Sequence, residues 1–173
     1  MSENTKELDV KARARKFIKD KGFTNSFIQE EVESFIIEHD EKYGHIVSLD
    51  ELIERLYDNL DIITFDSEHR PANGELGEYE GRVYDDEDKD TITLYSDEKS
   101  MELSDYDKEH WDIYTEKDKK ELLQKAETNK QDIKDTIKHE LTHAAYTIKG
   151  KYGIGETHVF NEMRKKYFWR QIL

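Results

Sequence analysis

Hydrophobic residues recur at helical spacing through much of the first sixty positions. The first set of such residues is Val10, Ala14, Phe17 and Ile18. After a break at residues 22–25, the second set is Phe27, Val32, Phe35, Ile36 and Ile37. Apolar residues three to four positions apart are typical of an amphipathic helix, and glycine and asparagine in the break are turn formers. The pattern predicts two helices within residues 5–43.

A third helix and a first strand are predicted next. Ser48 and Glu51 have the spacing of a capping box, in which the serine caps the helix and the glutamate bonds back to it. The apolar residues that follow are at helical spacing. The run 61–65 is short and rich in isoleucine, which is typical of a strand.

The middle of the chain changes to a β-type pattern. Residues 67–77 contain the only proline of the chain and two glycines, Gly74 and Gly77, so a loop is expected. The runs 78–84 and 91–95 are rich in Tyr, Val, Ile and Thr, and six polar residues at 85–90 separate them. Two such runs joined by a polar loop predict a β-hairpin. Residues 97–114 are mostly polar and predict no element.

The last third is predicted to be helical with one interruption. Helical character begins near Thr115, is polar as far as Asn129, and becomes amphipathic over 131–148. Three glycines at 150, 153 and 155 interrupt it. Apolar residues at helical spacing then predict a final helix, which begins near Glu156.

Composition narrows the classes of protein. The 173 residues include 41 acidic and 27 basic ones, a net charge of −14, which argues against a general nucleic-acid binder. The absence of cysteine excludes disulfides and thiolate metal sites. The first residues lack an apolar signal core, and no apolar run approaches membrane-spanning length. A cytoplasmic protein without membrane contact is expected.

The segment His139-Glu140-Leu141-Thr142-His143 carries the candidate chemistry. Positions i and i+4 of a helix lie on one face, so His139 and His143 can bind one Zn²⁺. Glu140 can then take a proton from a zinc-bound water and pass it to a leaving amine. Two solvated surface histidines are the alternative. Most tyrosines are packing residues, so neither Tyr146 nor Tyr152 is assigned a role at an oxyanion.

A third zinc ligand is expected shortly after this helix, because catalytic zinc keeps three protein ligands and one open position. Glu156, His158 and Glu162 are the candidates. Glu156 falls in phase with the apolar face of the predicted last helix, whereas His158 and Glu162 fall on its polar face. A carboxylate facing a core needs a partner, and this favours Glu156.

These residues resemble the small metallopeptidases of phages and mobile elements that are related to the ImmA/IrrE type. The resemblance rests on His139, Glu140 and His143, a glycine-rich break, and Glu156 three residues before Val159. It implies that Glu156 is the third ligand and that the substrate is an intracellular protein such as a repressor-type regulator. The residues also resemble a rival group, the SprT-like proteins. That resemblance would instead make His158 the third ligand and proteins crosslinked to DNA the substrate, and the net charge of −14 disfavours such a substrate.

The predicted protein is therefore α+β. A helical N-terminal extension (1–60) precedes a minimal zincin-like domain (61–173), whose small sheet is followed by a metal helix and a ligand helix. The expected activity is zinc-dependent hydrolysis of peptide bonds. The alternative is an acidic, non-catalytic interaction or DNA-mimic module of phage type with a structural or vestigial zinc site.

Overall fold

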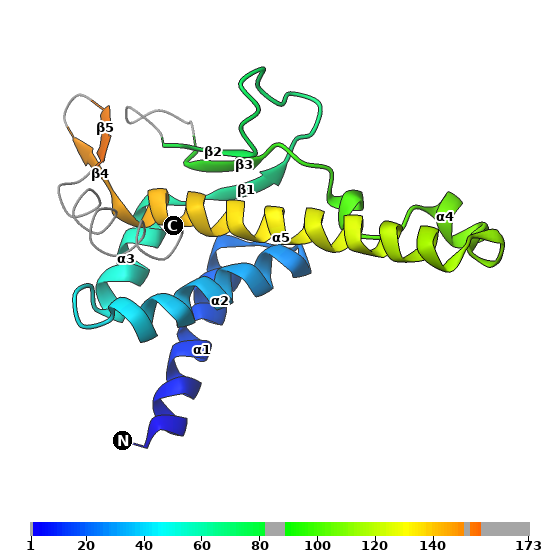
Figure 1. Cartoon of the computed structure of the whole chain (residues 1–173). Helices are drawn as coiled ribbons and strands as arrows, with labels where there is room; N and C mark the ends of the chain where they lie inside the picture. Colours follow the sequence, from blue (N-terminus) through cyan, green and yellow to red (C-terminus); the bar gives the residue numbers. More distant parts are fainter. Residues whose placement is uncertain (1, 82–88, 151–152, 157–173) are drawn as a thin grey trace.

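The computed structural model of the 173-residue chain describes residues 2–81, 89–150 and 153–156. Its longest element is the helix α5 (Glu116–Tyr146). This helix runs between a group of N-terminal helices on one side and a small sheet on the other (Figure 1). Helices and sheet occupy separate layers, so the predicted α+β class is confirmed.

Three helices make up the N-terminal part: α1 (Glu3–Lys21), α2 (Ser26–Tyr43) and α3 (Leu49–Asn59). Each begins after a serine or asparagine whose side chain accepts a hydrogen bond from a backbone N–H of the first turn. Helix α1 ends at Gly22, whose φ of 74° lies in the left-handed region that glycine adopts without strain. All three predicted helices are confirmed.

The predicted capping box at the start of α3 is half formed. The Ser48 hydroxyl accepts a hydrogen bond from the backbone N–H of Glu51. The carboxylate of Glu51 instead accepts a hydrogen bond from the Arg55 guanidinium, with an N–O distance of 2.6 Å. A charged partner one turn along the helix therefore replaces the bond to the backbone.

The sheet contains β1 (Ile62–Phe65), β2 (Gly77–Glu80) and β3 (Thr91–Leu94). Strand β3 lies in the centre, parallel to β1 and antiparallel to β2. The predicted strand and hairpin pairing are thus confirmed, and residues 82–88, which include the end of the predicted second strand and most of the predicted connection, lie outside the described residues. Strand β2 forms an edge of the sheet and lies beside α5 (Figure 1).

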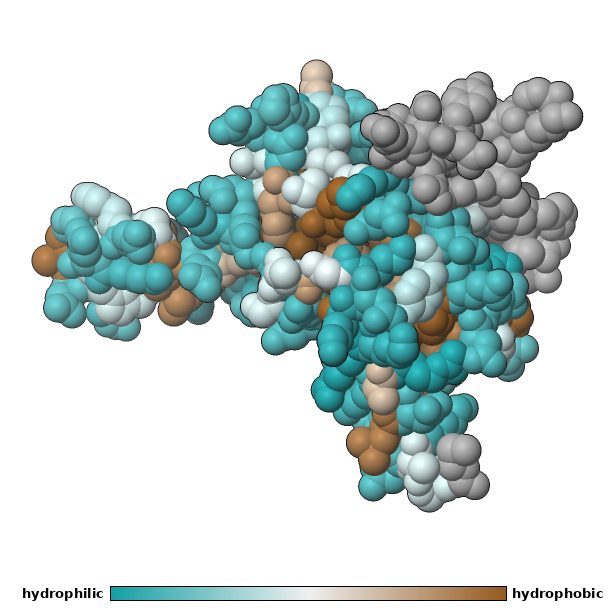
Figure 2. Space-filling model, turned by 180° about the vertical axis from the view of Figure 1, so that it is seen from behind, coloured by the Kyte–Doolittle hydropathy of each residue, from teal (hydrophilic) through white to brown (hydrophobic). Residues whose placement is uncertain are grey.

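Three short helical segments join the sheet to α5, in a region where the sequence predicted no element. They are η1 (Glu98–Met101), α4 (Asp105–Glu109) and η2 (Trp111–Ile113). Together with the first turns of α5 they form an arm that projects from the rest of the molecule (Figure 1). Hydrophilic residues cover most of the face seen in Figure 2. Within the described residues, no helix is both long and apolar enough to cross a membrane.

Helix α5 joins the predicted polar and amphipathic stretches into one element of 31 residues. Thr115 caps it, and the Thr115 and Asp118 side chains form a reciprocal capping box. The helix ends at Tyr146, two residues before the predicted end, because Thr147 is extended and begins a strand.

A second hairpin follows, formed by β4 (Thr147–Gly150) and β5 (Gly153–Glu156). The prediction that a helix begins near residue 156 is wrong for this residue, which lies in a strand. Glycine disfavours helix, and pairing of the two strands satisfies the backbone groups of the glycine-rich stretch. The rest of the predicted last helix, with His158 and Glu162, lies outside the described residues.

The core is built around the apolar face of α5. Ile133, Ile137, Leu141 and Ala144 are buried, as the helical pattern predicted. They belong to one hydrophobic cluster that includes residues of α1, α2 and α3 and, from the sheet, Ile92 and Leu94. The N-terminal helices therefore share a core with α5 and the sheet.

Candidate metal centre

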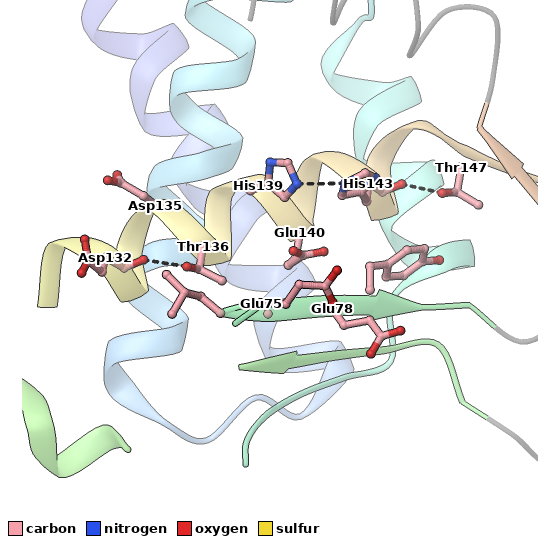
Figure 3. A pocket seen from close by; sticks show the side chains of 12 residues that line it. Glu75, Glu78, Asp132, Asp135, Thr136, His139, Glu140, His143 and Thr147 are labelled. Carbon is pink, nitrogen blue, oxygen red and sulfur yellow. Dashed lines mark hydrogen bonds between the residues drawn. The ribbon is translucent and has the colours of Figure 1, made fainter. Parts of the chain in front are cut away.

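The three residues of the zinc-binding motif lie in the C-terminal half of α5. His139 and His143 are one turn apart, the first exposed and the second half-buried. Glu140 points away from them, toward the sheet, and is only 6% exposed (Figure 3). The helix therefore presents two imidazoles to solvent and one carboxyl group to the space between α5 and β2.

The two histidine rings turn the same nitrogen toward each other. Their Nε2 atoms are 3.0 Å apart (Figure 3). Two imidazole nitrogens on one tetrahedral zinc, each about 2.0–2.1 Å from the metal, would be separated by about 3.3 Å. Neutral imidazole nitrogens are good zinc ligands, so His139 and His143 fit two positions of a zinc site.

Glu140 is held in an unusual environment for a carboxyl group. Burial raises its pKa to about 7 from an ordinary value of 4.5. A hydrogen bond from the backbone of Tyr79 opposes this shift, and the negative charges of Glu75 and Glu78 add to it. The group can therefore both accept and release a proton near neutral pH.

The motif lines a pocket of about 770 Å³ between α5 and β2 (Figure 3). One wall is α5, from Asp132 to the motif and on to Thr147 just beyond the helix end. The opposite wall is the run 75–79, which comprises the approach to β2 and its first residues. A concave site with a perturbed titratable group is the default candidate for a functional site.

Gly77 sets the width of this pocket. A Cβ atom at this position would lie 2.5 Å from the Cγ2 atom of Thr136 and 3.4 Å from the Cγ atom of Glu140. The first distance is shorter than any ordinary carbon contact, so only glycine lets β2 come this close to α5. The close approach places the edge strand directly beside Glu140.

Similarity to known proteins gives no guide to this pocket. No protein-family model, curated protein or solved structure matches the chain. The function therefore has to follow from the residues that line the pocket.

The predicted third ligand, Glu156, is the last residue of β5, where its Cα atom pairs with that of Thr147. Thr147 lines the pocket, so the second hairpin brings the backbone of residue 156 beside the pocket wall. Within the described residues, no group of three His, Asp or Glu side chains is arranged to hold a metal ion. Of the predicted site residues, His139, Glu140 and His143 therefore line one pocket, with Glu140 directed from the histidines toward β2.

A side chain from α3 holds the point where α5 ends. Asn59 is buried, and its amide nitrogen donates to the carbonyl oxygens of Ala144 and Thr147, at 2.9 and 2.8 Å. The Tyr79 hydroxyl in turn donates to the carbonyl oxygen of Asn59. Asn59 therefore satisfies carbonyl groups that the helix end leaves without an intrahelical partner, directly after His143.

The sequence analysis did not single out a buried histidine of α2 that contacts the last residue of α5. His39 is 3% exposed, and its Nε2 is hydrogen-bonded to the hydroxyl of Tyr146. Burial, with a smaller contribution from the nearby positive charge of Arg55, lowers the pKa of His39 to about 4. Its helical spacing from Phe35 was the available signal. Tyr146 is buried outside the pocket, in agreement with a packing role, and Tyr152 lies outside the described residues.

Proposed function

We propose that this chain is a zinc-dependent metallopeptidase that hydrolyses peptide bonds in an intracellular protein. His139, His143 and Glu156 hold the metal, and Glu140 acts as general base and then as general acid. The small sheet, the metal helix and the following ligand segment form a minimal zincin-like domain. A repressor-type regulator is the kind of substrate that this proposal favours.

The convergence of three α5 side chains on one pocket carries the proposal. The Nε2 atoms of the two imidazoles lie 3.0 Å apart, and Glu140, which lies between the two histidines in sequence, is 6% exposed and lines the same pocket. Burying a carboxyl group is costly, and a pair of solvated surface histidines would not require it. A catalytic base beside a metal is a role that accounts for both features.

The chain's own residues perform the proton transfers. Zn²⁺ held here would supply a Lewis acid that polarises the substrate carbonyl and acidifies the attacking water. Glu140 takes the proton from this water, because a pKa near 7 keeps part of the population ionised at neutral pH. The hydrogen bond from the Tyr79 backbone orients the carboxylate. Glu140 then donates the proton to the leaving amine.

The position of β2 supports a peptide substrate. Among the strands of the described residues, β2 lies at an edge of its sheet and pairs with β3 on one side only. The hydrogen bond from the backbone of Tyr79 to Glu140 indicates that the other edge of the strand is turned toward the pocket. An extended peptide can pair with such an edge, which would lay its backbone along the catalytic carboxylate.

Metal analysis and one conservative variant test the proposal. Protein purified without an affinity tag should contain about one zinc per chain, and His139→Ala should lose it, whereas His45→Ala, at an exposed position away from the pocket, should not. Glu140→Gln should keep the metal and the fold but lose at least a hundredfold in peptide hydrolysis.

The same variant separates the two candidate functions. If Glu140→Gln retained full biological activity, the peptidase proposal would fail. An acidic interaction or DNA-mimic module with a structural or vestigial zinc site would then be the better account. The net charge of −14 is the feature that favours this alternative.

The assignment of Glu156 has its own test. Glu156→Gln should weaken zinc binding by at least tenfold in a chelator competition, because loss of an anionic ligand leaves only two neutral nitrogens. Glu127→Gln, which removes an exposed carboxylate elsewhere, is the matched control. Unchanged zinc affinity in Glu156→Gln would reject this ligand, and His158→Ala and Glu162→Gln would then be compared in the same assay.

A further inference from the structure

The walls of the proposed active-site pocket are strongly acidic. Apart from Glu140, four carboxylates line it: Glu75, Glu78, Asp132 and Asp135. Among the described lining residues there is no lysine or arginine. All four carboxylates are exposed, and none makes an ion pair within the described part of the chain. The pocket therefore presents uncompensated negative charge to whatever enters it.

The four carboxylates lie on two opposing walls. Glu75 and Glu78 belong to the β2 side, and Asp132 and Asp135 belong to α5 (Figure 3). Neutral groups hold two of them in place. The Tyr95 hydroxyl donates to Glu78 at 2.7 Å, and the Gln131 side-chain amide donates to Asp135 at 2.9 Å. These contacts position the carboxylates and leave their charge intact.

The negative charge on the α5 wall is displaced to one end of the pocket. Asp135 lies four residues before His139, and Asp132 lies seven residues before it. These separations correspond to about 6 and 10 Å along a helix axis. At the other end, beyond His143, Thr147 is the lining residue. An extended peptide advances about 3.3 Å per residue, so the acidic end lies two to three residues from the reacting bond.

The carboxylates are too dispersed to be a second metal site. Within the described residues, no three acidic or histidine side chains are grouped closely enough to hold one ion. Charge spread along two walls of a cleft is complementary to an extended ligand with several cationic groups.

We propose that the pocket selects cationic peptide segments, with lysine or arginine two to three residues from the cleaved bond on one side of it. This rests on the proposed peptidase function and names its substrate class. The long side chains of lysine and arginine would reach Asp132 and Asp135 on the α5 wall, and Glu75 and Glu78, which lie beside Glu140, add negative charge on the opposite wall. A basic segment of an intracellular protein is then the favoured substrate, and an acidic one is repelled.

Peptide binding tests the charge selection independently of catalysis. The probes are fluorescently labelled extended peptides that differ only in carrying lysine, glutamine or glutamate at the same positions. Binding to the zinc-loaded full chain with Glu140→Gln is measured by anisotropy at low and high ionic strength. Lysine peptides should bind about tenfold more tightly than the glutamate peptides, the size expected for a few partly exposed ion pairs, and salt should reduce the difference.

Two double variants and one matched control locate the effect. The preference is the ratio of the dissociation constants of the glutamate and lysine peptides. Its logarithm should fall by at least half in each of two double variants, Glu75→Gln with Glu78→Gln and Asp132→Asn with Asp135→Asn. Glu109→Gln with Glu127→Gln makes the same change in net charge at exposed positions outside the pocket and should retain it. An equal loss in the control would attribute the preference to the overall charge of −14 and overturn the proposal. Equal binding of all peptides would also overturn it.

Cleavage by the wild-type chain distinguishes this inference from the proposed function. Peptides with a single lysine moved along the sequence should be cut fastest when it lies two or three residues to one side of the bond. Cleavage without any charge preference would reject the cationic specificity and leave the peptidase function standing. Selective binding of lysine peptides without cleavage would reject the peptidase function and leave a pocket for basic segments.

Discussion

Glu140 is the residue whose chemistry depends most on its surroundings. Its position in the helix directs its side chain away from the two histidines and toward β2. There, burial raises the pKa of its carboxyl group, and the backbone of Tyr79 donates a hydrogen bond to it. Burial of a carboxyl group favours the protonated form, so this one residue links protonation to the stability of the fold.

The stability of the metal-free protein should depend on the ionisation of Glu140. The folded state binds this proton more tightly than the unfolded chain, whose pKa is the ordinary 4.5. The free energy of unfolding should therefore fall as the pH rises from 4.5 to about 7, by about 3 kcal/mol from this group. Urea denaturation in the presence of a chelator measures it, and Glu140→Gln should lack this component. Parallel pH profiles for the two proteins would contradict the assignment.

Helix α5 and strand β2 determine the shape of the pocket together. The strand approaches the helix at Gly77, where there is space for a hydrogen atom but not for a methyl group beside Thr136. The end of α5 is set by Asn59 of α3, which bonds to carbonyl groups after the second histidine. The close approach at Gly77 and the hydrogen bonds of Asn59 both bring together residues that are far apart in sequence.

Adding one methyl group at the strand should separate these two elements. Gly77→Ala places its Cβ atom against the Cγ2 atom of Thr136 and should cost about 1–3 kcal/mol of stability. It should also lower the proposed peptidase activity. Thr136→Ser removes that methyl group and keeps the hydroxyl that donates to the Asp132 carbonyl oxygen. The double variant should therefore recover most of the loss, as measured by thermal denaturation and hydrolysis. A double variant no better than Gly77→Ala would show that another contact limits the approach.

The molecule as a whole is organised around the two faces of α5. Residues of α1, α2 and α3 join the buried face of this helix and Ile92 and Leu94 of β3 in one hydrophobic cluster. Lys138 of α5 also bonds to Glu38 of α2 at 3.0 Å. The first sixty residues therefore cover a surface that α5 would otherwise expose to water.

A chain that begins at residue 61 should not fold alone. Ile137 and Leu141 are fully buried in the hydrophobic cluster that α5 shares with α1, α2 and α3, and removal of these three helices would expose part of that cluster to water. Leaving one such side chain exposed costs about 1.5–3 kcal/mol. The fragment 61–173 should show no cooperative thermal transition by circular dichroism, and addition of the separate fragment 1–60 should restore one. A cooperative transition of 61–173 alone would show that these residues form an independent domain.

The elements that depend on neighbours in sequence could be predicted from the sequence. The period of the apolar residues indicates α1, α2 and α3, and Ser48 marks the start of α3. The four-residue spacing of His139 and His143 places both on one helical face. These features arise from contacts within one or two helical turns. Local sequence is therefore sufficient to specify them.

Tertiary contacts decided the rest. The end of α5 at Tyr146 depends on Asn59, some 85 positions earlier in the chain, and the protonation of Glu140 depends on its burial against β2. The second hairpin was predicted as a break followed by a helix, because a glycine-rich run does not specify its own pairing partner. The acidic walls of the pocket come from two segments more than fifty residues apart, so their charge complementarity exists only when long-range packing brings them face to face.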